Sequence, residues 1–254
     1  MNKKTIFFVG GTKGGVGKST ISIFLIDYFL ENNKSIALCE TDNGNPDVYK
    51  VYQKLLTADN KNLLSTFDIS KNGGWVDMFN FIGDLPDDVT NILINTKGGN
   101  IETIDLMIKD ESTKNLLSYD DLINFHIIWV VGDDKDGISV LLEFLKKTEY
   151  TNFKIDVLLN NNFQQNNDII KNSELQENIS KFGGNIFNFP KISRSSFLEQ
   201  VRLKRTPISE IYKTLKFGDR IEMERYRKLV SYILKIICNE EVDDVNKEKV
   251  LWRP

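Results

Sequence analysis

Eleven residues near the amino terminus combine glycine, lysine and hydroxyl side chains at a spacing that suits phosphate binding. Glycines let backbone N–H groups turn inward around an anion. Lys18 can reach the β- and γ-phosphates of a nucleoside triphosphate, the Ser19 hydroxyl can complete a Mg²⁺ shell, and Thr20 can face the α-phosphate. The run is Gly10-Gly11-Thr12-Lys13-Gly14-Gly15-Val16-Gly17-Lys18-Ser19-Thr20. It predicts a nucleotide site.

The segments on either side of this loop have the order that such a site requires. The apolar run 5–9 predicts a buried strand, and the run 21–30 predicts a helix whose amino end adds partial positive charge at the phosphates. Further short apolar runs alternate with helical patterns, at 35–39, 90–94, 125–131, 154–159 and 185–189. We therefore predict an α/β fold, with a doubly wound, mostly parallel sheet and helices on both faces.

Weaker patterns predict a strand at 64–69 and a short helix at 75–82. From 193 to 238 the sequence shows only helical patterns, ending in an amphipathic stretch. We expect one domain over 1–238, and a polar tail over 239–254 that is loosely ordered.

Composition limits which metal sites and disulfides the protein could have, and in which cellular compartment we expect it. The 254 residues carry a net charge of -3 and include one histidine and two cysteines. Cys39 and Cys238 lie far apart, which favours reduced thiols, and His126 precedes an apolar run, which favours a strand position. Without a Cys/His cluster, zinc and iron–sulfur sites are excluded. No signal peptide or membrane-length apolar stretch is evident, so we expect a cytoplasmic protein.

The run Lys13 to Thr20 resembles the deviant Walker A box of the ParA/MinD ATPases, a family that includes nitrogenase iron protein and arsenite-pump ATPases. The resemblance implies ATP and Mg²⁺ as cofactors, and a homodimer formed on ATP binding. In that family the early lysine, here Lys13, crosses to the phosphates of the other subunit. The stretch from Glu40 to Asp47 is similar to the plasmid stability and conjugal mobilisation (StbB/TraL-like) branch.

Further segments match the family in order, over the chain up to about residue 210. Glu40-Thr41-Asp42-Asn43-Gly44 is similar to switch I, which implies that Asp42 positions the attacking water and lies near the metal. Asn160 resembles the position that reads adenine. The segments Phe189-Pro190-Lys191-Ile192-Ser193-Arg194 and Thr206-Pro207-Ile208 resemble the adenine-flanking segments, with Pro190 and Lys191 beside the base.

One position departs from the family pattern. Asn95-Thr96-Lys97-Gly98-Gly99 stands where the family has its Walker B aspartate, so Asn95 replaces that acid. Asn95 keeps an oxygen that can accept from a Mg²⁺-bound water, but it lacks the negative charge that favours the metal. The departure predicts weakened metal binding and slow hydrolysis. We hypothesise that Glu40 supplies the missing charge.

The segment 191–235 is strongly basic, with twelve Lys or Arg residues against five acids. Such an excess can bind duplex DNA through its phosphates without reading sequence. The alternative is a solvated helical face, since Lys and Arg on amphipathic helices commonly face water. The candidate DNA contacts are Arg194, Arg202, Lys204, Arg205 and Arg220.

Two functions follow from these features. The first is an ATP-dependent dimerisation switch with slow hydrolysis, which binds double-stranded DNA non-specifically in plasmid partition or mobilisation. Its partners would be a DNA-bound adaptor or a mobilisation protein, at the nucleoid of a prokaryote. The second is a nucleotide-sensing adaptor that hardly hydrolyses ATP and recruits a protein. The acidic segment 240–244 argues against membrane recruitment, and no motif supports a small-molecule kinase.

Overall fold

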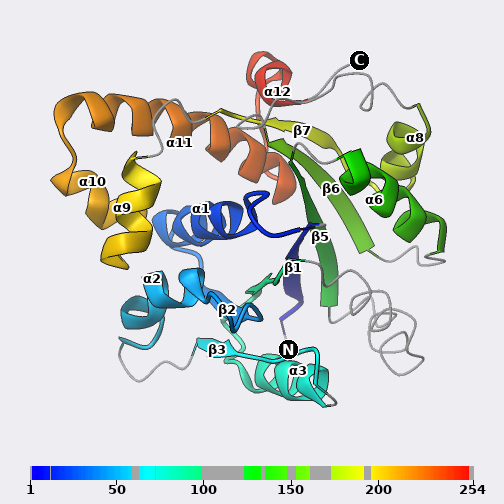
Figure 1. The fold of residues 1–254 in the computed structure, drawn as a ribbon, viewed down its shortest axis with the longest axis horizontal. Helices are drawn as coiled ribbons and strands as arrows, with labels where there is room; N and C mark the ends of the chain where they lie inside the picture. Colours follow the sequence, from blue (N-terminus) through cyan, green and yellow to red (C-terminus); the bar gives the residue numbers. More distant parts are fainter. Residues whose placement is uncertain are drawn as a thin grey trace.

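A seven-stranded parallel sheet forms the centre of the molecule (Figure 1). In the computed structural model, the described residues are 2–11, 13–58, 63–71, 73–98, 123–132, 135–147, 153–160, 173–191 and 196–251. The strand order is β3-β2-β4-β1-β5-β6-β7. The strands are β1 (Lys4–Gly10), β2 (Ile36–Glu40), β3 (Leu64–Thr66), β4 (Asn91–Asn95), β5 (Ile123–Val131), β6 (Phe153–Asn160) and β7 (Ile186–Phe189).

Helices cover both faces of the sheet, which explains why its central strands are apolar along their whole length. In Figure 1, α1 and α11 lie on one side of the sheet, and α6 and α8 lie on the other. The described helices are α1 (Lys18–Glu31), α2 (Asp47–Leu56), α3 (Gly74–Asp84), α6 (Lys135–Lys147), α8 (Ser173–Lys181), α9 (Ser196–Lys204), α10 (Ile208–Thr214), α11 (Phe217–Ile237) and α12 (Asp244–Val250). The predicted doubly wound fold is confirmed, including the two weaker elements, which form β3 and α3.

The single histidine occupies the predicted strand position, in β5. His126 is 4% exposed, and its Nε2 lies 2.7 Å from Oδ2 of Asp156 on the neighbouring strand β6. The backbone N–H of Asn185 donates to the other oxygen of this carboxylate at 2.6 Å. Burial lowers the pKa of His126 below its ordinary value, although the adjacent carboxylate opposes this. The pair therefore ties neighbouring strands together inside the core.

The segment after Cys238 differs from the expected loose tail. It forms α12, which packs against α11 and β7, and buries Val250 to 1% exposure. The Asp243 side chain accepts a hydrogen bond from the N–H of Asn246 and so caps the helix. Leu251 then forms an antiparallel bridge with Phe187 of β7. The segment is short and polar in sequence, and its order comes from these tertiary contacts.

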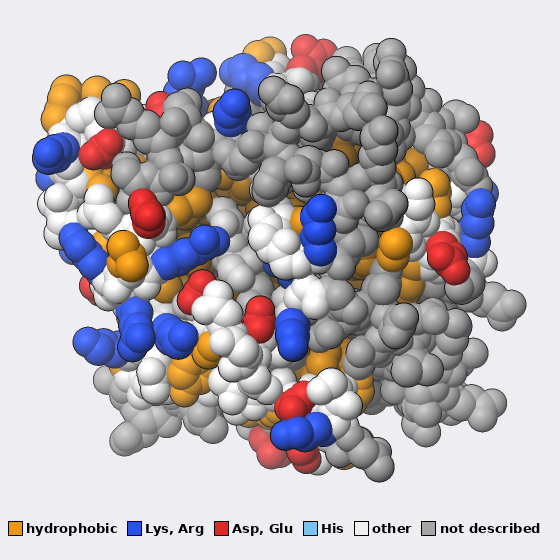
Figure 2. All heavy atoms as spheres, viewed as in Figure 1, with side chains coloured by type: hydrophobic (Ala, Val, Ile, Leu, Met, Phe, Trp, Pro, Cys, Tyr) orange, Lys and Arg blue, Asp and Glu red, His pale blue; other side chains and the backbone are white. Residues whose placement is uncertain are grey.

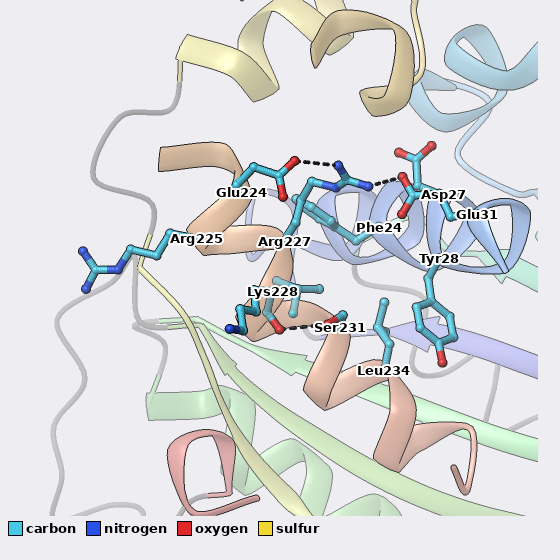
Figure 3. A pocket seen from close by; sticks show the side chains of 11 residues that line it. Phe24, Asp27, Tyr28, Glu31, Glu224, Arg225, Arg227, Lys228, Ser231 and Leu234 are labelled. Atoms are coloured by element: carbon cyan, nitrogen blue, oxygen red, sulfur yellow. Dashed lines mark hydrogen bonds and ion pairs between the residues drawn. The ribbon is translucent and has the colours of Figure 1, made fainter. Parts of the chain in front are cut away.

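The helix that follows the phosphate loop, α1, is buried along nearly all of its length. Eleven of its 14 residues are buried, so it packs on every side, against the sheet and against α2, α10 and α11. One of the buried residues is an acid, Asp27, which is 4% exposed. A cavity of about 430 Å³ lies between α1 and α11 beside it (Figure 3). In that view Arg227 of α11 reaches between Glu224 and Glu31.

Asp27 joins three helices through its carboxyl group. The N–H of Ile208, at the start of α10, donates to Oδ2 at 3.2 Å, and the carboxyl also hydrogen-bonds Tyr52 of α2. The Tyr52 hydroxyl also donates to the carbonyl of Ile23 at 3.0 Å, so it links α2 to α1 as well. Burial raises the pKa of Asp27 from 3.8 to about 7, reinforced by Glu31 and opposed by these hydrogen bonds and by Arg227.

We expect stability to fall as the pH rises, in part because of Asp27. The folded protein keeps a proton that the unfolded chain releases between pH 3.8 and about 7, so the free energy of unfolding decreases across this range. The contribution of this one group is of the order of 4 kcal/mol. Asp27→Asn should remove that part of the pH dependence, as measured by urea unfolding at pH 5 and pH 8. Asp77→Asn, at an exposed position of α3, is the control. An unchanged slope in Asp27→Asn would contradict the assignment.

Candidate functional site

The predicted site residues gather where the strand order of the sheet reverses. β1 lies between β4 and β5, and ligands of such sheets bind at this reversal, beyond the carboxyl ends of the strands. Gly10 ends β1, Glu40 ends β2, Asn95 ends β4 and Asn160 ends β6. Residues up to 150 positions apart in sequence thereby lie at one edge of the sheet.

The phosphate loop needs glycine at two positions for its backbone. Gly15 has φ +82° and Gly17 has φ +113°, in the left-handed region that other residues avoid. A Cβ on Gly17 would also lie 2.5 Å from Nδ2 of Asn160. That same nitrogen donates to the carbonyl of Val16 at 2.8 Å. Asn160 thus holds the loop itself, a contact that its predicted role toward adenine did not anticipate.

The side chain of Lys18 is enclosed by the loop, with 6% exposure. Its ammonium donates to the carbonyl of Lys13 at 2.7 Å. Burial lowers the pKa of Lys18 from 10.5 to about 8, and the attraction of Asp42 opposes this only in part. A buried cation with incomplete compensation favours an anion beside it. The loop therefore fits a phosphate group on its physical chemistry as well as on its motif.

Lys13, in the same loop, is exposed. Gly98, three residues after the end of β4, packs against the backbone beside it. A Cβ on Gly98 would lie 2.4 Å from the nitrogen of Gly14 and 2.6 Å from the carbonyl carbon of Lys13. The segment after β4 is thus in direct contact with the phosphate loop.

Asn95 is the central member of a buried hydrogen-bond chain. Its Nδ2 donates to Oε1 of Glu40 at 2.8 Å, and its Oδ1 accepts from the Ser22 hydroxyl at 2.8 Å. All three residues have 0% exposure. Glu40 and Asn95 are also direct partners in the β2–β4 register. Asn95, at the Walker B position, is therefore hydrogen-bonded to Glu40, the acid that we suggested supplies the missing charge. Ser22 belongs to this chain and was missed, because one serine in an apolar helix carries no signal.

The Glu40 carboxylate accepts two backbone hydrogen bonds as well. The N–H of Asp42 donates to Oε1 at 3.0 Å, and the N–H of Tyr49 donates to Oε2 at 3.4 Å. Burial nevertheless raises the pKa of Glu40 from 4.5 to about 7, against the effect of these donors and of Asn95. Asp42 is partly exposed beside it, and its Oδ1 accepts from the N–H of Asn45 at 3.2 Å. Glu40 is thus buried, whereas Asp42 is partly exposed and attracts the charge of Lys18.

No cluster of three or more His, Cys, Asp or Glu side chains suited to a metal occurs among the residues that the structure describes. A Mg²⁺ ion held with a nucleotide does not need one, because phosphate oxygens and water fill most of its shell. Ser19 in the first turn of α1 and Asp42 after β2 are both partly exposed at this edge of the sheet. Their oxygens suit the ion.

At the predicted adenine end, Pro190 is half-buried and Lys191 is exposed directly after β7. Phe189 at the end of that strand packs against Tyr226 of α11 with ring centroids 5.8 Å apart. The structure does not bring either adenine-flanking residue into a contact that tests its role. Arg194 and its neighbours lie outside the described residues.

The four described candidates for DNA binding differ in their surroundings. Lys204 and Arg205 are exposed at the end of α9. Arg220 donates to the carbonyls of Leu215 and Lys213, each at 2.9 Å, and so closes the end of α10. Arg202 donates to Oγ1 of Thr20 at 3.0 Å, which sequence reasoning did not foresee. Figure 2 shows Lys and Arg side chains over the part of this face formed by α9, α10 and α2, with acidic and apolar side chains among them.

None of the helices within the described ranges is long and apolar enough to cross a bilayer.

Comparison with known proteins gives consistent matches. The family model of the CobQ/CobB/MinD/ParA nucleotide binding domain matches residues 7–208. Protein MobD of Acidithiobacillus ferrooxidans is 27% identical over 248 residues, which are 93% of this chain and 99% of that protein.

Two solved structures share the fold at 14% identity. MinD of Pyrococcus horikoshii OT3, a septum site-determining protein complexed with Mg-ADP, has a TM-score of 0.53 and covers 92% of this chain and 97% of its own. The MinC:MinD cell division protein complex of Aquifex aeolicus has a TM-score of 0.50, with 94% and 98% covered.

Proposed function

Because the chain belongs to the CobQ/CobB/MinD/ParA nucleotide-binding family, we propose that it is an ATP-dependent dimerisation switch with slow Mg²⁺-ATPase activity. The observation that carries this proposal is the difference in burial between two lysines of one loop. Lys18 is buried and donates to the carbonyl of Lys13, whereas the Lys13 side chain is exposed. One suits the phosphates of its own subunit, and the other suits those of a second copy.

Mg²⁺ would neutralise charge on the β- and γ-phosphates. The Ser19 hydroxyl would bind it directly, and Asp42 and Asn95 would act through water. Gly14 to Gly17 would surround the phosphates with N–H groups, and Thr20 would meet the α-phosphate. Asp42 would orient the water that attacks the γ-phosphorus, yielding ADP and phosphate. Because Asn95 lacks charge, the buried Glu40 that it contacts would have to supply the charge of the Walker B aspartate, which supports a slow rate.

The proposed output is non-specific binding of double-stranded DNA, in plasmid partition or mobilisation. The local excess of seven positive charges in 191–235 supports it, as does the similarity to a protein named MobD. The exposed Lys204 and Arg205 are the described residues best placed for phosphate contacts. A DNA-bound adaptor or mobilisation protein would be the partner, in the cytoplasm at the nucleoid.

A second candidate is an adaptor that binds ATP, hardly hydrolyses it and recruits a protein. Exposed apolar side chains on the same helices favour it. Phe217 and Ile221, one turn apart at the start of α11, are 80% and 57% exposed, and Leu203 of α9 is 77% exposed. Such residues contribute to protein interfaces more than to phosphate contacts.

The test is binding to random-sequence duplex DNA across a salt series, with Mg²⁺ and either ADP or a slowly hydrolysed ATP analogue. We expect binding with the analogue only, with an affinity that falls steeply as salt rises. Lys204→Glu/Arg205→Glu should lower this affinity at least tenfold. Lys247→Glu/Lys249→Glu, with the same change of charge on α12, should not.

Turnover separates the two candidates. Lys13→Ala should abolish ATP hydrolysis and leave ADP affinity unchanged, since this lysine serves the second subunit. Tight nucleotide binding without DNA binding or turnover in the unmodified protein would favour the adaptor. Absence of nucleotide binding would refute both.

A further inference from the structure

The guanidinium of Arg202 lies at the amino end of α1, beside the phosphate loop. Its Nη2 donates to Oγ1 of Thr20 at 3.0 Å, although the two residues are 182 positions apart. Thr20 is 8% exposed and is the third residue of α1. The N–H groups of this first turn point out of the helix toward the loop. An anion seated there lies within reach of both Thr20 and Arg202.

Arg202 has a neutral partner where its charge would favour an acidic one. Arg202 is exposed, no carboxylate among the residues that the structure describes forms an ion pair with it, and its guanidinium donates to a hydroxyl. A guanidinium offers five N–H donors in a planar fork that matches phosphate oxygens, and one contact with Thr20 uses few of them. The remaining donors suit a phosphate on the turn that Thr20 occupies.

The helix that carries Arg202 is fixed at its two ends by different contacts. Near its start, Phe197 packs against Tyr226 of α11 with centroids 6.0 Å apart, and Tyr226 packs against Phe24 of α1 at 5.1 Å. Near its end, Arg202 provides the polar contact to α1. Arg202 and the residues that follow it directly, Leu203, Lys204 and Arg205, are all exposed. The contact of Arg202 with Thr20 therefore adds a polar link to α1 at this end of α9, which otherwise packs against α2, α10 and α11.

We propose that Arg202 binds the α-phosphate of the nucleotide, and that this contact fixes the end of α9 and so the surface formed by Leu203, Lys204 and Arg205. The inference rests on the proposed nucleotide site and reassigns Arg202 from the DNA surface to that site. Because ADP and ATP share the α-phosphate, Arg202 would bind both nucleotides in the same way. Lys13 and the dimer would then distinguish ATP from ADP.

Isothermal titration with ADP and with ATP tests the contact. Arg202→Ala should lower the affinity for both nucleotides about 30-fold, the range of one hydrogen bond to a charged group. Arg202→Lys should lose less, because it keeps the charge without the fork. Arg225→Ala, which removes another exposed arginine at a position on α11, should bind both nucleotides as the unmodified protein does.

Two readouts do not depend on the stability of the variant. The two α-thio diastereomers of ADP should bind the unmodified protein with different affinities, and the ratio should approach one in Arg202→Ala. Amide hydrogen exchange over 197–204 should slow on ADP binding in the unmodified protein but not in Arg202→Ala, whereas α1 should be protected in both.

The outcomes separate this inference from the proposed function. If the unmodified protein binds ADP and Arg202→Ala binds it equally well, Arg202 is not a nucleotide contact. If that variant also loses DNA binding, Arg202 belongs to the DNA surface. An unaltered diastereomer ratio in Arg202→Ala overturns the α-phosphate assignment. Absence of ADP binding by the unmodified protein refutes the nucleotide site, and this inference with it.

Discussion

Lys18→Met should lower ADP affinity at least 100-fold and yet leave the ligand-free protein as stable as before, or more stable. The loss reflects removal of charge-assisted hydrogen bonds to phosphate, each of which contributes about 1.5–3 kcal/mol. The gain in stability arises because burial makes the charged ammonium of Lys18 unfavourable in the folded protein and lowers its pKa from 10.5 to about 8. Methionine fills a similar volume without that charge.

The sign of the stability effect follows from proton binding. Between pH 8 and 10.5 the unfolded chain keeps the Lys18 proton and the folded protein releases it, so this group makes stability rise with pH there. At pH 7 its burial costs of the order of 3 kcal/mol. Thermal unfolding without nucleotide and titration with ADP measure the two effects. Lys13→Met, on the exposed side of the loop, should change neither by much. Wild-type ADP affinity in Lys18→Met would refute the site.

Asn95→Asp should destabilise the protein by about 3 kcal/mol at pH 8, even though it restores the family residue. The new carboxylate would stand where Asn95 now donates to Glu40 at 2.8 Å, so two buried acids would face each other without a proton donor. Glu40→Gln/Asn95→Asp should recover most of the loss, because the glutamine amide can donate in the opposite direction. Urea unfolding of the single and double variants gives the coupling energy directly.

The same variants test whether Glu40 supplies charge for the metal. Glu40→Gln alone should weaken the Mg²⁺ dependence of nucleotide binding, and adding Asn95→Asp should restore it. The control is Asp47→Asn, a partly exposed acid at the start of α2. Unchanged Mg²⁺ dependence in Glu40→Gln would remove Glu40 from the metal site. Full stability of Asn95→Asp would show that the two side chains do not share a hydrogen bond.

The sequence predicted the sheet and the phosphate loop because short stretches of neighbouring residues indicate both. Buried parallel strands give continuous apolar runs, and the loop needs glycines at particular backbone angles, so Gly15 and Gly17 signal it directly. In the structure, Glu40, Asn95 and Asn160 end β2, β4 and β6 and so lie at one edge of the sheet. Their roles toward a nucleotide remain predictions.

What could not be predicted depends on contacts between distant segments. The Ser22 hydroxyl meets Asn95 and the Arg202 guanidinium meets Thr20 only once the helices have packed. The sequence shows Gly98 only as a glycine in a loop, whereas in the structure a Cβ at this position would clash with the backbone of Gly14. The order of α12 likewise comes from packing against α11 and β7, which its polar composition conceals.

The bridge between Leu251 and Phe187 has a consequence for solubility. β7 is the last strand at one side of the sheet, and its outer side would present unpaired backbone N–H and C=O groups. Such an edge can recruit a strand from another molecule and begin aggregation. Leu251 and α12 occupy part of this edge. A polar segment without an evident catalytic or binding motif therefore shields the sheet from unintended self-association.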